Sequence, residues 1–326
     1  MPQVSIIIPV FNVAPYITKC LQSVATQTYQ DAIECLIIDD CGQDNSISLA
    51  ESFINNYNKD RHDNNIEFRI LHHKHNRGLS AARNTGMENA KGAWIYFLDS
   101  DDWITPECIE LMMKCTLLYT NIDAVFAGTT VSTGAHGYLD YEKNSKPLFC
   151  DNRELIAKSM LKRKVYGMTA WNKLIKKAII IQNNIPFVDG LIHEDEVWNF
   201  DLAKVLTKIA FVNTNTYFYL KREGSIVSEG EKQIHITRKF ILWQELLKHI
   251  YGYRKQDQIK ALSGWIIEEV QKDLINYNWK IFYLFTRLAI KAHSSLSFYL
   301  FIQGLLGLFK HHKFHNHKIV KHITLQ

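Results

Sequence analysis

The sequence predicts an α/β fold with a mostly parallel central sheet flanked by helices, followed by a helical C-terminal region. Three observations lead to this prediction. Short β-rich runs alternate with amphipathic helical patterns in the first part of the chain, as in sheets built from βα units. Beyond about Gly230 only helical periodicity remains. With 326 residues, 47% of them hydrophobic, the chain is long enough to bury a sizeable core.

Four strands are expected in the first part of the chain. They are Val4–Pro9, Ile33–Asp39, Glu67–Leu71 and Trp94–Leu98. In parallel α/β sheets, ligands bind beyond the carboxyl ends of the strands. The loops that follow the first, second and fourth strands are therefore the expected location of a site.

Helical patterns lie between these strands. Ile17, Leu21 and Val24 recur at the spacing of a buried helical stripe. Further helices are expected over Asp44–Tyr57, where Asp44 is a good N-cap, and over Leu79–Ala90.

The second half of the chain is harder to interpret. Pro106 is expected to open a helix in which Ile109, Met113 and Leu117 share a face. No elements are assigned within Thr129–Pro186, where acceptor-side loops are expected. Two late strands are expected, at Phe211–Val212 and Thr216–Leu220. Two amphipathic helical stripes are expected after them. The first consists of Phe240, Trp243, Leu247 and Ile250, and the second of Ile266, Val270, Leu274 and Tyr277.

Composition disfavours several classes of protein. The six cysteines form no CxxC pair, so neither a disulfide framework nor a zinc knuckle is expected. The net charge of +5 is modest and no Arg-rich run is interleaved with aromatic residues, so no nucleic acid partner is expected. Met1 opens no secretory leader, which predicts a cytoplasmic location.

Three carboxylates lie on one tight turn directly after the fourth expected strand, in Leu98-Asp99-Ser100-Asp101-Asp102. Clustered anions repel each other, so such a turn is costly unless a cation binds or water solvates it. Mn²⁺ or Mg²⁺ suits these oxygen ligands and typically uses one or two protein carboxylates. A solvated acidic turn that caps the following helix is the alternative, and the turn by itself does not decide between them.

Four runs together match one known pattern in order along the chain. They are SIIIPVFN at 5–12, IIDD at 37–40, NRGLSAARNTG at 76–86 and FLDSDD at 97–102. These runs resemble the motifs of family 2 glycosyltransferases of the bacterial surface-polysaccharide type. The resemblance implies a GT-A fold, Rossmann-like, whose first part binds a nucleotide sugar. One departure is Cys41, which stands where a glycine or Gly-Ser turn is commoner.

The resemblance also implies roles for donor-side residues. Pro9, Phe11 and Asn12 would shape the nucleoside pocket, and Asp39 or Asp40 would meet the base. A carboxylate can accept the imide N–H of uracil, so a UDP-sugar is the expected donor. A turn or helix-cap role is the alternative for Asp39.

Further donor-side residues lie in the third and fourth motifs. Arg77 would neutralise the diphosphate, with an exposed turn arginine as the alternative. Asp101, with Asp99 or Asp102 assisting, would hold the metal ion, and Asp99 and Ser100 would contact the substrate.

A second acidic cluster, His193-Glu194-Asp195-Glu196, resembles the family's base motif. Asp195 would deprotonate the acceptor hydroxyl and Glu194 would contact the substrate. The alternative is that these residues only cap the helix that follows. Arg83 and Asn84 are expected to make structural polar contacts between loops.

Two other segments are candidate parts of the site. In YLKREGS, Tyr219, Arg222 and Ser225 resemble a closing segment in which Arg222 would bind donor phosphates. Trp171 and Asn172 are candidates to line the acceptor side, although Trp171 suits a core position equally well.

We expect a glycosyltransferase domain at 1–228, with a nucleotide-sugar-binding half at 1–128 and an acceptor-side half at 129–228. The helical region follows at 229–326. Within it Leu296–Phe309 is an apolar run with a basic, histidine-rich flank, too short to span a bilayer. It suits an interfacial helix at the inner face of the cell membrane or a buried terminal helix equally well.

The expected function is metal-dependent, inverting transfer of a sugar from a nucleotide diphosphate donor to a glycan or lipid-linked glycan acceptor in cell-surface polysaccharide synthesis. A polyprenyl-phosphate sugar synthase and a non-catalytic sugar-nucleotide-binding protein are the alternatives. The sequence identifies neither the sugar nor the oligomeric state.

Overall fold

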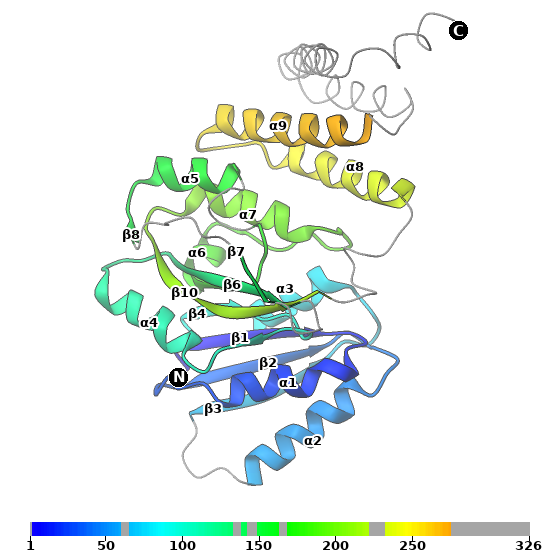
Figure 1. Ribbon diagram of the computed structural model, residues 1–326, viewed down its shortest axis with the longest axis vertical. Helices are drawn as coiled ribbons and strands as arrows, with labels where there is room; N and C mark the ends of the chain where they lie inside the picture. The colour runs from blue at the N-terminus through cyan, green and yellow to red at the C-terminus, as the bar shows by residue number, and fades with distance from the viewer. Residues whose placement is uncertain are drawn as a thin grey trace, which may run out of the picture. The chain divides into compact units, whose positions relative to one another are not determined.

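The computed structural model describes residues 2–59, 65–132, 138–141, 149–162, 168–221 and 232–274 (Figure 1). The chain divides into two compact units, Met1–Gln233 and Ile234–Gln326. The first unit carries all the described strands, and the regular elements described in the second unit are helices. The domain boundary that the sequence suggested, at 228/229, stays a prediction.

A single sheet forms the centre of the first unit, with strand order β3-β2-β1-β4-β9-β6-β10-β5. The strands are β1 (Val4–Val10), β2 (Ile33–Asp39), β3 (Ile66–His72), β4 (Trp94–Phe97), β5 (Trp103–Ile104), β6 (Ala124–Ser132), β7 (Tyr138–Tyr141), β8 (Phe149–Cys150), β9 (Lys173–Lys176) and β10 (Ile209–Leu220). The first four run parallel, as do β6 and β10, whereas β9 is antiparallel to both of its neighbours.

Helices cover both faces of the sheet. They are α1 (Ala14–Ala25), α2 (Ser46–Lys59), α3 (Leu79–Asn89), α4 (Cys108–Leu118), α5 (Arg153–Leu161), α6 (Lys177–Gln182) and α7 (Glu194–Val205). Helices α1 and α2 pack against each other, while α3 packs on β1 and β2 (Figure 1). Apart from the first two residues of α8 (Lys232–Lys248), this helix and α9 (Lys255–Leu274) belong to the second unit.

The residues of strand β1 pack against helices on both faces of the sheet. Ile6 and Ile8 belong to the same core cluster as Ile17 of α1. Ile7 points to the other face, where a Cβ built on Gly86 of α3 would lie only 2.3 Å from Ile7 Cγ2. A parallel strand covered on both faces needs apolar residues at every position, and each residue of β1 is buried. The approach of α3 to the sheet therefore depends on the missing side chain of Gly86.

The four strands predicted in the first part of the chain are confirmed. The predicted helix after Pro106 is present but begins at Cys108. Of the three residues predicted to share a face, Ile109 and Met113 are buried, whereas Leu117 is 82% exposed. Cys115 and Tyr119, at the end of the helix, are partly buried and pack against the core, so the buried face continues there without Leu117.

The two late strands predicted separately form one strand, β10, whose register with β6 shifts between Val212 and Tyr217. This irregularity interrupts the alternation of side chains, which is why the sequence suggested two strands. Residues 129–186, where no element was assigned, include the end of β6, β7, β8, α5, β9 and α6.

In the second unit, the first predicted stripe is only partly correct. Trp243 is buried, but its buried companions are Leu242 and Leu246, while Leu247 and Ile250 are only partly buried. Among the helices that the structure describes, none combines the length and apolar character required to span a membrane. The run Leu296–Phe309 lies outside the described residues.

Candidate active site

The loops that follow β1 and β2 are locked together. Asn12, in the left-handed backbone region with φ 52°, accepts a 2.6 Å hydrogen bond at Oδ1 from the Gln43 amide. A Cβ on Gly42 would lie 2.9 Å from the Asn12 nitrogen, so this approach needs a glycine. Pro9 is buried in β1, whereas the Phe11 ring is 46% exposed. Of the predicted nucleoside-pocket residues, Phe11 and Asn12 thus lie at the surface of the joined loops.

Asp40 is buried and holds the loop that contains Arg77. Its Oδ1 accepts a 2.8 Å hydrogen bond from the Arg77 amide, and its Oδ2 accepts one of 2.8 Å from the Gly78 amide. The Nδ1 atom of His73 lies 2.7 Å from the same Oδ1. Both carboxylate oxygens of Asp40 therefore have protein partners within the fold.

Asp39 is the more accessible of the two adjacent aspartates. Its Oδ1 accepts a 3.0 Å hydrogen bond from the Cys41 amide, and its Oδ2 lies 2.8 Å from His72 Nδ1. Cys41 has φ 57°, which accounts for the glycine that is commoner at this position. The Arg77 side chain is 44% exposed and its Nη2 lies 3.9 Å from Asp189 Oδ2. Arg77 is thus a surface arginine on a loop that Asp40 fixes.

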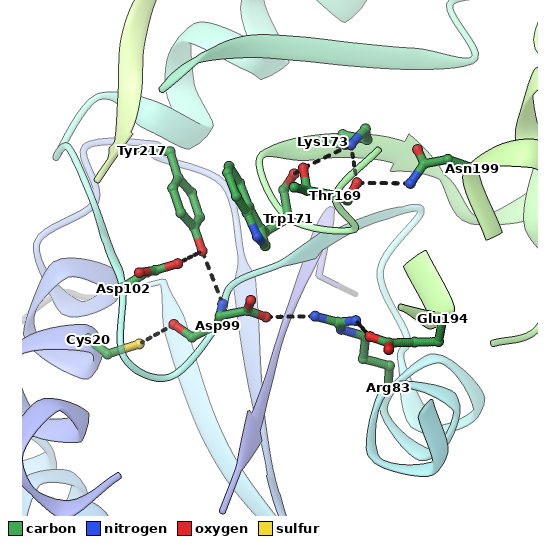
Figure 2. Close-up of polar contacts among 10 residues, drawn as sticks. All are labelled: Cys20, Arg83, Asp99, Asp102, Thr169, Trp171, Lys173, Glu194, Asn199 and Tyr217. Carbon is green, nitrogen blue, oxygen red and sulfur yellow. Dashed lines mark hydrogen bonds and ion pairs between the residues drawn. The ribbon is translucent and has the colours of Figure 1, made fainter. Parts of the chain in front are cut away.

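The acidic turn (Asp99–Asp102) connects β4 to β5, and its backbone closes through a 3.0 Å hydrogen bond from the Asp102 amide to the Asp99 carbonyl. Asp102 is 1% exposed. Its Oδ2 accepts a 2.6 Å hydrogen bond from the Tyr217 hydroxyl, and its Oδ1 accepts one of 2.8 Å from the Leu220 amide (Figure 2). Burial, and then the charges of Asp101 and Asp99, raise the pKa of Asp102 well above its ordinary value.

The acidic turn fits a divalent cation through two of its three carboxylates. Asp99 and Asp101 are partly exposed, whereas Asp102 and Ser100 are buried. Mg²⁺ and Mn²⁺ use one or two protein carboxylates together with substrate phosphates, which matches this supply of oxygen ligands. Within the described parts of the chain, no three His, Cys, Asp or Glu side chains gather as a ready-made metal cluster.

Arg83 joins the two acidic segments and is the residue whose importance sequence reasoning understated. Its guanidinium is buried, donates a 2.8 Å hydrogen bond from Nη2 to Asp99 Oδ1, and donates from Nη1 to Glu194 Oε1 (Figure 2). The expectation of a polar contact between loops is confirmed for Arg83.

Helix α7 presents Glu194, Asp195 and Glu196 in its first turn, where the helix dipole favours negative charge. The Trp198 ring stacks on Phe187 at 4.8 Å and meets the edge of Phe97 at 5.6 Å. Phe97 ends β4, two residues before Asp99. Aromatic packing and the Arg83 bridge together bring the first turn of α7 to the acidic turn.

Asp195 has a carboxyl group with an unusual environment. Burial is the largest cause that raises its pKa well above the ordinary value, followed by the negative charge of Glu194. The positive charges of Arg83 and Lys173 oppose this shift. A carboxyl group with a raised pKa is a stronger base than an ordinary aspartate, which suits the role of a proton acceptor.

The remaining predicted residues fall into three groups. Trp171 is partly buried and stacks on Tyr217 at 4.4 Å and on Tyr219 at 5.6 Å. The suggestion that Asn172 lines the acceptor side was wrong, because Asn172 is 4% exposed and its amide nitrogen donates to Ala127 O, Gly128 O and Thr129 Oγ1. Arg222 and Ser225 lie outside the described residues.

Comparison with known proteins finds relatives in sequence and in fold. EpsH of Bacillus subtilis (strain 168) is 32% identical over 241 residues, which cover 72% of this chain and 65% of EpsH. The chain therefore spans just under two thirds of the length of that relative.

Two solved structures share the fold. Staphylococcus aureus TarS 1–349 in complex with UDP-GlcNAc has a TM-score of 0.69 at 17% identity, covering 94% of this chain and 89% of that one. The mannosyltransferase PcManGT from Pyrobaculum calidifontis, in complex with GDP-Man and Mn²⁺, has a TM-score of 0.54 at 15% identity, covering 95% and 88%. The expected GT-A type of α/β fold is confirmed.

The family model for glycosyl transferase family 2 matches residues 5–182. This match includes β1 to β4, the acidic turn and Arg83. Since it covers more than half of the chain, the chain belongs to glycosyl transferase family 2.

Proposed function

We propose that this enzyme transfers a sugar, with inversion, from a UDP-sugar to a hydroxyl of a glycan or lipid-linked glycan acceptor in the synthesis of a surface polysaccharide. The observation that carries the proposal is the buried Arg83 guanidinium, which contacts both Asp99 of the acidic turn and Glu194 of α7. This contact supports one reaction centre that combines a donor-side turn with a candidate base.

The donor side rests on the joined loops after β1 and β2. Phe11 offers an exposed ring, and Asp39 offers a partly exposed carboxylate that suits the imide N–H of uracil. TarS is a relative in fold that binds UDP-GlcNAc, which favours a uridine nucleotide. Arg77, fixed by Asp40, supplies positive charge at the rim for the diphosphate.

Asp101 is the proposed principal ligand of Mn²⁺ or Mg²⁺, with Asp99 assisting. A metal ion bound there would stabilise negative charge on the departing nucleoside diphosphate. Three carboxylates on one short turn repel each other, which supports a cation at this turn. PcManGT, which shares the fold, binds Mn²⁺ with its nucleotide sugar.

Asp195 is the proposed base. Its carboxylate would take the proton from the acceptor hydroxyl as the oxygen attacks the anomeric carbon, while the bond to the diphosphate breaks. Glu194 and Arg83 hold the first turn of α7 in place beside the reacting groups. Attack from the face opposite the leaving group gives inversion in one displacement, and no covalent enzyme intermediate is needed.

A donor and acceptor screen tests the proposal. The purified chain would be treated with EDTA and then given Mn²⁺ with UDP-GlcNAc, UDP-glucose, UDP-galactose or GDP-mannose, with release of nucleoside diphosphate as the readout. We expect release from one UDP-sugar only when the metal is present, with a loss of about 10²–10³ in Asp101→Asn. Retention of full activity after metal removal would contradict the metal-dependent mechanism.

A comparison of acceptors distinguishes a glycosyltransferase that acts on glycans from a polyprenyl-phosphate sugar synthase. With the selected donor, glycan oligosaccharides and a polyprenyl phosphate would be compared, and the anomeric configuration of the product determined by NMR. A glycan product of inverted configuration supports the proposal, whereas transfer only to the polyprenyl phosphate establishes the lipid-phosphate alternative. Retained configuration would overturn the role of Asp195 in a single displacement.

A further inference from the structure

The hydroxyl of Tyr217 spans the acidic turn from its first residue to its last. Tyr217 lies in β10, far from the turn in sequence, and is fully buried. Its hydroxyl oxygen accepts a 3.3 Å hydrogen bond from the Asp99 amide and donates one of 2.6 Å to Asp102 Oδ2 (Figure 2). One phenol group thus contacts both ends of the turn that carries Asp101.

The rest of the contacts extend this connection along β10. Asp102 Oδ1 accepts the Leu220 amide at 2.8 Å, and Leu220 is the last residue of β10. Strand β5, which follows the turn, also pairs with β10 through Tyr217 and Ile104. The acidic turn is therefore tied to β10 by side chains and backbone together.

The tyrosine ring is itself held in place. Trp171 stacks on Tyr217 with 4.4 Å between ring centroids and an interplanar angle of 11°. Replacing Tyr217 by phenylalanine would retain this stack and remove only the hydroxyl contacts. Comparing Tyr217→Phe with the unchanged protein therefore tests the hydrogen bonds of the hydroxyl separately from the packing of the ring.

Both oxygens of Asp102 are occupied by these hydrogen bonds in a buried position. A metal ion would have to reach a remaining lone pair on a carboxylate that is 1% exposed, whereas Asp99 and Asp101 are partly exposed. We propose that Tyr217 and Asp102 are positioning residues that hold the acidic turn in the shape that presents Asp101 and Asp99, and that Asp102 is not a metal ligand. This inference rests on the proposed function, since it concerns the same metal-binding turn.

The two assignments of Asp102 predict opposite results for two conservative variants. In Asp102→Asn the amide oxygen still accepts from Leu220 and the amide nitrogen can donate to the Tyr217 hydroxyl. The hydrogen bonds that join the acidic turn to β10 therefore persist without the negative charge of Asp102. In Tyr217→Phe all carboxylates remain, but the hydrogen bonds of the Tyr217 hydroxyl with Asp99 and Asp102 are lost. A positioning role predicts a mild Asp102→Asn effect and a strong Tyr217→Phe effect, whereas a ligand role predicts the reverse.

The experiment measures Mn²⁺ affinity of the full chain in the presence of UDP, by electron paramagnetic resonance of free Mn²⁺. We expect Asp102→Asn to bind within about threefold of the unchanged protein and Tyr217→Phe to bind at least about tenfold more weakly, as for a lost hydrogen bond to a charged group. Tyr96→Phe is the matched control, because this buried tyrosine hydroxyl donates to Asn172 at 3.3 Å. It should leave Mn²⁺ affinity unchanged.

Amide hydrogen exchange gives a readout that needs neither metal nor activity. Tyr217→Phe removes the acceptor of the Asp99 amide, so exchange in the peptide that covers residues 97–104 should accelerate, while Tyr96→Phe should not change it. Should Tyr217→Phe fail to fold, Asp102→Ala replaces it. This variant removes both acceptor oxygens and should weaken Mn²⁺ binding where Asp102→Asn does not.

The outcomes separate this inference from the proposed function. A large loss of Mn²⁺ affinity in Asp102→Asn, with Tyr217→Phe unchanged, would make Asp102 a ligand and overturn the inference. Unchanged exchange in Tyr217→Phe would also overturn it. If Asp101→Asn binds Mn²⁺ as tightly as the unchanged protein, the proposed metal site fails instead, and the exchange result still decides whether Tyr217 holds the turn.

Discussion

Arg83 Nη2 lies 2.8 Å from Asp99 Oδ1, and the same buried guanidinium also pairs with Glu194, 111 residues away in sequence. The negative charges of Asp99 and Glu194 raise the pKa of Arg83 despite its burial. The cation therefore stays charged inside the protein, and its removal would leave two carboxylates facing each other without compensation.

Replacing Arg83 by methionine should destabilise the protein by about 3–5 kcal/mol, because breaking a buried ion pair leaves an uncompensated charge. The free energy of unfolding in urea measures this. Arg77→Met is the matched control, since its 3.9 Å pair with Asp189 is exposed and should contribute at most about 1 kcal/mol. Equal losses in the two variants would show that the Arg83 bridge is not a strong structural connection.

Asp195 is predicted to set the acid limb of the pH–rate profile. A base must be deprotonated, so kcat/KM should fall as the pH drops below its pKa, and the raised pKa of Asp195 moves this limb above about 4, the ordinary range of an aspartate. Asp195→Asn should abolish the limb and reduce the rate by about 10²–10⁴. An unaltered limb in the residual activity of this variant would assign the base to another group.

Lys173 should tune the same limb. It is buried, its positive charge lowers the pKa of Asp195, and it donates to the carbonyl of Thr169, which also accepts from Asn199 (Figure 2). Lys173→Met removes that charge, so the acid limb should move to higher pH, while Lys173→Arg should restore it in part. The profile measured with saturating donor checks this, and a shift to lower pH would show that the assumed electrostatic coupling has the wrong sign.

The sequence predicted where the loops after β1, β2 and β4 lie, because their residue types carry local signals. Gly42 and Gly78 mark turns, and Asp99 follows an apolar strand directly. Contacts between distant segments left no such signal. Nothing near Asp102 in the sequence indicates that Tyr217 donates to it, and the burial of Asn172 depends on strands β6 and β9, which had not been placed.

The fold shows the same division. Strands β1, β2 and β4 were predictable because burial on both faces requires continuous apolar runs. The prediction divided strand β10 in two at a register irregularity, and the helical spacing of Ile109, Met113 and Leu117 did not show that Leu117 is exposed. Periodicity reports which positions of a helix share a face, but it does not report which of them the rest of the protein covers.

Glu34 offers a stability test remote from the reaction centre. Its buried carboxylate accepts from Ser5 Oγ at 2.5 Å, from the amides of Lys91 and Gly92, and from Arg69 at 3.3 Å. Glu34→Gln loses the charge that faces Arg69, at a cost of about 1–3 kcal/mol of unfolding free energy. Because these residues lie at the start of β1 and β2, kcat/KM per folded molecule should stay unchanged. A fall in kcat/KM without a fall in stability would contradict this assignment.

Gly86 and Ile7 should show compensating effects. A methyl group on Gly86 would lie 2.3 Å from Ile7 Cγ2, so Gly86→Ala must push α3 away from β1 or force Ile7 off its rotamer, at about 1–3 kcal/mol. Ile7→Ala alone opens a cavity and costs about 2–5 kcal/mol. In the double variant the new methyl group enters the space that Ile7 vacates, so the loss should be smaller than the sum of the single losses. Urea unfolding of the four proteins measures this coupling. Additive losses would mean that α3 does not press on β1 at this point, and that the position of Arg83 in the same helix is set by other contacts.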